Sequence, residues 1–177
     1  MTEASHVGDL VTRLALSHPE VSFRFINNGQ VKLHTSGNGN LKDVIYHIYG
    51  REIASNLIEV DFERKGIHIT GYLGKPLISR GNRNFENYFV DGRYIKSSII
   101  SKAIEDGYKD FTMQHKYPFV VLYLDVDTEH VDVNVHPTKM EMRFQRQQDV
   151  YNIVYEGVHR TFWSRNSFLR WRRRLQK

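Results

Sequence analysis

Hydrophobic positions near the amino terminus recur at helical spacing and then switch to alternation. The helical stripe consists of Val7, Leu10, Val11 and Leu14. This spacing predicts a helix, with Ser5 as its expected N-cap and Pro19 as its stop. Residues 21–26 then alternate apolar and polar side chains, as a half-buried strand does.

The turn signal Asn28-Gly29 follows, and residues 31–35 return as a second strand, so a β-hairpin is predicted. The run SGNGN at residues 36–40 is the best candidate for a linker. A helix and a hairpin cannot bury a stable core by themselves. We therefore expect this first segment to belong to a larger unit.

The rest of the chain alternates between strand and helix patterns. Helices are predicted at 41–50, 96–111 and 147–162, and strands at 57–63, 67–73, 87–93, 118–126 and 131–135. Residues 118–126 are almost continuously apolar, which predicts a central strand covered on both faces. This order of elements predicts an α+β fold: a two-layer arrangement of a sheet with helices on one face.

Charge is distributed unevenly along the chain. The formal net charge is +5, yet the last fourteen residues carry six basic side chains and no acid, so residues 1–163 have a net charge of −1. Bulk attraction to a polyanion would therefore come mainly from the tail. The chain has no cysteine and no apolar run long enough to span a membrane, which favours a cytoplasmic protein.

Two short motifs carry the most specific information. The first, FVDGR, occupies residues 89–93, and the second, VDVNVHPTK, occupies residues 131–139 and leads into Glu141, Arg143 and Phe144. Together with the helix that begins at Gln147, they resemble the second domain of the MutL family of DNA mismatch repair ATPases. The family's usual residue at position 91 is Asn, where this sequence has Asp91.

The resemblance implies a fold and a division into domains. The fold would be the ribosomal-protein-like second domain of GHKL ATPases, with a left-handed βαβ crossover. Residues 1–36 would be the terminal helix and hairpin of the amino-terminal GHKL ATPase domain, and residues 37–163 the MutL transducer domain. Residues 164–177 form a basic tail that is expected to be disordered or non-native.

The resemblance also implies a function. A MutL transducer domain acts in DNA mismatch repair, where it couples ATP binding and hydrolysis to conformational change and DNA binding. The implied partners are the ATPase domain of the same chain, DNA without sequence preference, the mismatch-recognition protein MutS and a second copy in a homodimer. ATP and Mg would be cofactors of the intact protein. The nucleotide-binding motifs are not found in this sequence, so we expect no cofactor and no enzymatic activity of the fragment itself.

Lys139 is the residue that the resemblance singles out. In the family this loop lysine reaches the γ-phosphate of ATP in the neighbouring ATPase domain. An ammonium is a compact charge, suited to sensing whether a terminal phosphate is present. Asn134, His136 and Pro137 are expected to shape the loop, because proline fixes its own φ and restricts the residue before it.

Four basic residues around the polar loop 75–84 and the Asp91-Gly92 turn are the expected DNA contacts of the folded body. They are Arg80, Arg83, Arg93 and Lys96. Cationic side chains along a groove bind the phosphate backbone without reading its sequence.

An acidic run allows a different reading of the chain. It contains Asp125, Asp127, Glu129, His130 and Asp132, which could form the metal site of a small phosphodiesterase. Acids between two strands are more often a solvated turn, so no metal is expected here. A second alternative is a stand-alone nucleic-acid-binding domain of ribosomal-protein type that uses the same fold and the basic tail.

Overall fold

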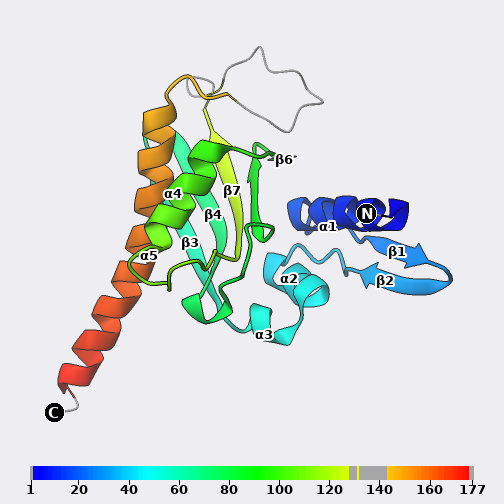
Figure 1. Ribbon diagram of the computed structural model, residues 1–177, viewed down its shortest axis with the longest axis horizontal. Coiled ribbons are helices and arrows are strands. Elements are labelled where there is room, and N and C mark those ends of the chain that lie inside the picture. The colour runs from blue at the N-terminus through cyan, green and yellow to red at the C-terminus, as the bar shows by residue number, and fades with distance from the viewer. Residues whose placement is uncertain (1, 128–130, 132–142, 176–177) are drawn as a thin grey trace.

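The computed structural model describes residues 2–127, 131 and 143–175. Two sheets organise this part of the chain, a hairpin near the amino terminus and a mixed sheet of five strands. Helices flank the larger sheet, and the last of them extends well past its edge (Figure 1).

The first segment folds as a helix followed by a hairpin. Helix α1 spans Glu3–Ser17, and strands β1 (Arg24–Asn27) and β2 (Gln30–His34) pair antiparallel. Asn28 and Gly29 both have positive φ, at 51° and 73°, which a two-residue turn of this kind requires. The predicted hairpin is confirmed.

The predicted cap of α1 is wrong. Thr2 is the N-cap, and its side chain accepts a hydrogen bond from the backbone N–H of Ser5. The helix therefore starts one turn earlier than expected, because a threonine three residues before Ser5 caps equally well.

The apolar stripe of α1 is only partly covered. Val7, Leu10 and Leu14 are 41%, 55% and 39% exposed, whereas Ala15 and Leu16 are fully buried. Most of the predicted core face of α1 therefore lies against solvent in the described residues.

The linker predicted at residues 36–40 is attached to the next helix. Asn40 caps α2 (Leu41–Tyr49) by accepting from the Asp43 N–H, and Ser36 and Asn38 both donate to the Asp43 carboxylate. A glycine at position 50 with φ of 91° separates α2 from the short helix α3 (Arg51–Ala54). The polar loop thus holds α2 in place.

The main sheet has the strand order β3-β4-β7-β5-β6. Strands β3 (Leu57–Arg64) and β4 (Ile67–Gly74) form an antiparallel hairpin, and β7 (Val120–Val126) lies between β4 and β5 (Glu86–Val90). Val120, Val121 and Leu122 are all completely buried, so both faces of β7 are covered. The prediction that β7 is central is confirmed.

Strands β5 and β7 run parallel, so the chain must cross over between them. The short strand β6 (Arg93–Tyr94) and helix α4 (Ser98–Tyr108) lie in this connection. Its left hand, implied by the family resemblance, stays a prediction.

Helix α5 runs from Gln147 to Leu175 and packs against α4 and the sheet. A Cβ at Gly107 of α4 would lie 2.7 Å from Val158 Cγ1, so a glycine allows the two helices to approach closely. Residues 164–175 continue this helix instead of forming the expected disordered tail. The reason is that no proline or glycine follows Gly157 in the sequence to stop it.

Both faces of the sheet carry a hydrophobic cluster, which corrects the expectation of helices on one face. One cluster joins the sheet to α4 and α5. The other joins it to α1, β2 and α2 through Leu16, Leu33, Val44, Ile45 and Val121. The α+β class itself is confirmed. The first segment was expected to belong to a larger unit, and its buried residues Ala15, Leu16 and Leu33 join the cluster on this second face.

Candidate functional site

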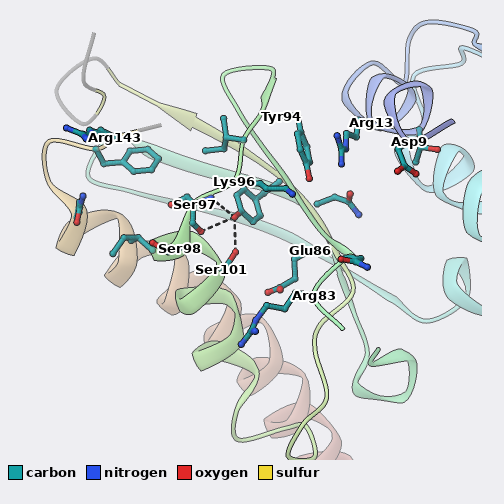
Figure 2. A pocket seen from close by; sticks show the side chains of 18 of the residues that line it. Asp9, Arg13, Arg83, Glu86, Tyr94, Lys96, Ser97, Ser98, Ser101 and Arg143 are labelled. Carbon is teal, nitrogen blue, oxygen red and sulfur yellow. Dashed lines mark hydrogen bonds between the residues drawn. The ribbon is translucent and has the colours of Figure 1, made fainter. Parts of the chain in front are cut away.

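A polar cavity of about 830 Å³ opens between α1, the β5–β6 edge of the sheet and the start of α4. Asp9 and Arg13 line it from α1, Glu86 from β5, and Arg143 from the segment before α5. Figure 2 shows Arg143 and Ser98 at one end of the cavity and Asp9 at the opposite end. Four parts of the chain that are far apart in sequence therefore meet here.

The FVDGR motif forms the end of β5 and the turn after it, and the residues on either side of the motif, Tyr88 and Tyr94, line the cavity. Asp91 and Gly92 occupy a turn with φ of 48° and 79°, conformations that Asp, Asn and Gly tolerate best. Asp91 Oδ1 accepts a hydrogen bond from the backbone N–H of Val126 at 3.0 Å, which joins the turn to the end of β7. An asparagine at this position could accept the same hydrogen bond through its side-chain oxygen.

The tyrosine of the same strand fixes the start of α4. The N–H of Ser97 donates to Tyr88 Oη at 2.8 Å, and this hydroxyl also lies 2.8 Å from Ser101 Oγ. Burial raises the pKa of Tyr88, so its hydroxyl stays protonated. Ser97 is the N-cap of α4 and accepts from the Ile100 N–H.

The cavity is therefore bordered by the positive end of a helix dipole. Lys96 and Ser98 precede and open this helix, and Arg143 lies at the same end. A helix start and two cations create an electrostatic environment that favours an anionic group.

The four predicted DNA contacts divide into two groups. Arg83 and Lys96 line the cavity, whereas Arg80 and Arg93 do not. Arg83 donates to Glu105 Oε1 at 2.8 Å, and its guanidinium lies over the Tyr117 ring. Arg80 lies over the Phe85 ring, 4.4 Å from its centroid. Lys96 is exposed on the rim, which leaves it the best placed of the four to meet a ligand.

Glu86 was not predicted as a site residue. Its side chain belongs to β5, whose five residues are all buried, and the residue is only 8% exposed. Neither carboxyl oxygen has a hydrogen-bond partner within the described part of the chain. Burial, together with repulsion from Glu105, raises the pKa of Glu86 to about 8, although Arg83 opposes the shift.

Arg13 and Arg143 were also missed. Arg13 lies over the Tyr94 ring at 4.3 Å, so it fixes α1 against β6. The strand was predicted to begin at residue 87, so Glu86 lay just outside it, whereas β5 begins at Glu86. The usable signal was an acidic residue directly before a largely apolar run. The positions of Arg13 and Arg143 depend on tertiary packing between segments that are distant along the chain.

The loop predicted to bear the phosphate sensor lies outside the described residues. This applies to Asn134, His136, Pro137 and Lys139. Val131 and Phe144 pair in an antiparallel bridge, so the chain enters and leaves this segment at neighbouring points. Phe144 also lines the cavity, which places both points beside it.

The acidic run does not converge in the described residues. Asp125 pairs in register with His68 of β4, and Asp127 lies against Gly66 in the β3–β4 turn. Among the residues that the structure describes, no three His, Asp or Glu side chains gather as a metal site would require. Glu129, His130 and Asp132 lie outside the described residues. No described helix is both long and apolar enough to cross a membrane.

Comparison with known families decides what this fold belongs to. Residues 45–162 match the family model of the DNA mismatch repair protein, C-terminal domain. This chain belongs to the MutL family of DNA mismatch repair proteins. The match begins inside α2 and ends in the part of α5 that packs on the sheet, so it covers the whole five-stranded sheet.

Relatives of this MutL-family chain are much longer than the chain itself. MutL of Agathobacter rectalis is 61% identical over 158 residues, which are 89% of this chain and 24% of that protein. MutL of Clostridium acetobutylicum is 45% identical over 157 residues, which are 89% of this chain and 25% of that protein. The chain therefore spans about a quarter of the length of these relatives.

Solved structures share the fold. The N-terminal domain of a DNA repair protein superposes with a TM-score of 0.75 at 20% identity, over 93% of this chain and 54% of that one. The ATPase domain of Aquifex aeolicus MutL superposes with a TM-score of 0.55 at 19% identity, over 87% of this chain and 51% of that one. The α+β fold is thus that of part of the MutL ATPase region.

Proposed function

We propose that this chain is the transducer module of a MutL-type ATPase and acts in DNA mismatch repair. The observation that carries the proposal is the family match over residues 45–162, in a chain that spans a quarter of its relatives' length. Such a module couples nucleotide binding elsewhere in the protein to conformational change and to DNA binding. ATP hydrolysis would require the remaining part of the protein, with ATP and Mg as its cofactors.

The coupling residue in this proposal is Lys139. Its ammonium would contact the γ-phosphate of ATP held by the ATPase domain and would lose that contact after hydrolysis. A contact made in only one nucleotide state shifts a conformational equilibrium by its differential free energy. The bridge between Val131 and Phe144 supports the proposal, because it brings together the two described residues that flank the segment containing Lys139.

The ATPase domain of the same chain is the first proposed partner. The apolar face of α1 supports it, since Val7, Leu10 and Leu14 are largely exposed in the described residues. Neighbouring apolar side chains on one helix face are a typical signature of a surface that another domain covers. This agrees with the expectation that residues 1–36 are the end of the ATPase domain.

DNA is the second proposed partner. Lys96 and Arg83, together with Arg80 and Arg93, would contact phosphates without sequence preference in the groove between two subunits of a homodimer. MutS is the remaining proposed partner. The nearly neutral charge of residues 1–163 implies that affinity for DNA is modest and sensitive to salt.

A domain exchange tests this function. Residues 3–163 would replace the matched region of Agathobacter rectalis MutL. The chimaera would then be expressed in a bacterial strain whose own MutL has been deleted, and mismatch repair would be measured. We expect repair well above that of an empty vector. A chimaera that folds and hydrolyses ATP but restores no repair would contradict the proposal.

A further inference from the structure

Glu86 lines the cavity with a buried carboxyl group that lacks hydrogen-bond partners among the described residues. It is 8% exposed and neither oxygen has a hydrogen-bond partner among the described residues. Leaving such a group unpaired costs about 1–3 kcal/mol, and more for a charge. Figure 2 shows this carboxyl between Ser101 and Arg83, on the inner wall of the cavity. A bound group that donates hydrogen bonds would relieve this cost.

The rim of the cavity favours a negatively charged group instead of a hydrogen-bond donor. Lys96, Ser98, Arg143 and the start of α4 all favour an anion, and Asp9 lies at the far end. Arg83 is already paired with Glu105, so it contributes less free charge than Lys96. The cavity is therefore complementary to a ligand that has N–H donors at one end and a negatively charged group at the other.

We propose that this cavity binds one unpaired nucleotide, whose base donates N–H groups to the Glu86 carboxyl and whose phosphate lies at the start of α4 beside Lys96 and Arg143. Exocyclic amines and ring N–H groups of bases pair with carboxyl oxygens, as in the reading of cytosine by Glu or Asp. A base removed from its stack is commonly held in a pocket by hydrogen bonds to its pairing edge. The inference rests on the proposed binding of DNA and adds which part of a DNA strand this cavity would bind.

The size of the cavity agrees with this ligand. A volume of about 830 Å³ lies within the usual range of small-ligand sites and exceeds what a single phosphate requires. Tyr88, Ile95 and Phe144 supply apolar wall, and Thr12, Asn87 and Ser101 supply further polar groups. Guanine presents two adjacent donors, which match the two oxygens of an ionised carboxylate, whereas thymine presents only one. Because these donors pair with the ionised form, binding of guanine should lower the raised pKa of Glu86.

The test compares two fluorescein-labelled single strands by anisotropy, one of fifteen thymines and one with a single central guanine. We expect the guanine to increase affinity by about fivefold, as one good pair of hydrogen bonds to a base provides. Glu86→Gln should remove this gain, and Glu86→Asp should keep part of it. Glu63→Gln is the control for the substitution itself, because Glu63 is exposed on β3 and does not line the cavity.

The sign of the change makes the test decisive. At a pH of about 8, where Glu86 is partly ionised, removing its charge should strengthen binding to any polyanion through bulk charge. Weaker binding of the guanine strand by Glu86→Gln, with Glu63→Gln unchanged or tighter, would support the nucleotide site. Equal or tighter binding by both variants would overturn it.

Two further arms separate the possible failures. Deoxyguanosine monophosphate alone, titrated against the protein, shows whether a free nucleotide occupies the cavity without a strand, and Glu86→Gln should abolish that binding. A duplex of the same sequence should bind without any dependence on Glu86. Loss of duplex binding together with an inactive chimaera would contradict the proposed function. Duplex binding that persists, with no guanine effect and no nucleotide binding, would contradict only this inference.

Discussion

The backbone N–H of Val126 donates to Oδ1 of Asp91 at 3.0 Å, and this bond joins the β5–β6 turn to the last residue of β7. The same aspartate has a φ of 48°, a conformation that short polar side chains tolerate better than others. Strands β5 and β7 are neighbours in the sheet but are separated in sequence by the whole α4 crossover. Asp91 thus fixes the β5–β6 turn to the central strand.

Asp91→Asn should therefore be nearly neutral, because the amide oxygen can accept the same hydrogen bond. Asp91→Ala should lower the free energy of unfolding by about 1–3 kcal/mol, since the Val126 N–H loses its partner and the strained φ is kept. Urea titration followed by circular dichroism measures both variants. Equal stability of the alanine and asparagine variants would show that the hydrogen bond is unimportant.

Gly107 allows α4 and α5 to approach each other. In Gly107→Ala the new Cβ would lie 2.7 Å from Val158 Cγ1, which is too close without movement of a helix. The gain in helix propensity of about 1 kcal/mol is offset by overpacking that costs about 1–3 kcal/mol. We expect a net loss of stability that the second substitution Val158→Ala partly reverses. Thermal unfolding that gives additive effects for the pair would contradict this contact.

Sequence patterns predicted most of the elements, because their period is set by local burial. The alternation in β3 and β4, the apolar run of β7 and the helical stripe around Ile100 and Ile104 all match the structure. The exposed stripe of α1 was not predictable in this way, since periodicity identifies an apolar face without saying what covers it. The cavity could not be predicted, because Arg13, Glu86 and Arg143 meet only through tertiary packing.

Protonation of Glu86 should stabilise the fold. The pKa is raised to about 8 in the folded state from 4.5 for an unperturbed glutamate, so the folded state binds more protons between these values. Stability is therefore full below about pH 4.5 and is lost as pH rises through about 8. The groups that face Glu86 electrostatically are Arg83, Glu105, Tyr88 and Tyr108, and the tyrosines stay neutral over this range.

The measurement is the free energy of unfolding of wild type and Glu86→Gln from pH 5 to 8.5. Each pKa unit corresponds to about 1.4 kcal/mol, so wild type should lose a few kcal/mol relative to the variant over this range. Parallel pH profiles for the two proteins would show that Glu86 does not titrate as described.

Removal of residues 164–177 should weaken duplex DNA binding, because six basic residues lie in this segment. The slope of log affinity against log salt is about −0.9 per neutralised phosphate, so most of the slope should disappear. Fluorescence anisotropy between 50 and 200 mM salt, roughly the range over which such effects are large, measures the change. An unchanged slope would assign the contacts to Arg80, Arg83, Arg93 and Lys96.

The measurement that tests the central claim most directly is ATP hydrolysis by the chimaeric MutL with and without Lys139→Ala. Loss of one partner of a desolvated charge pair typically costs about 2–5 kcal/mol, so we expect hydrolysis to fall at least about tenfold. ADP affinity should be nearly unchanged, because ADP lacks the γ-phosphate, and Lys139→Arg should restore activity only in part. Unchanged hydrolysis, or equal losses of ATP and ADP binding, would contradict a role for Lys139 as the γ-phosphate sensor of a transducer module.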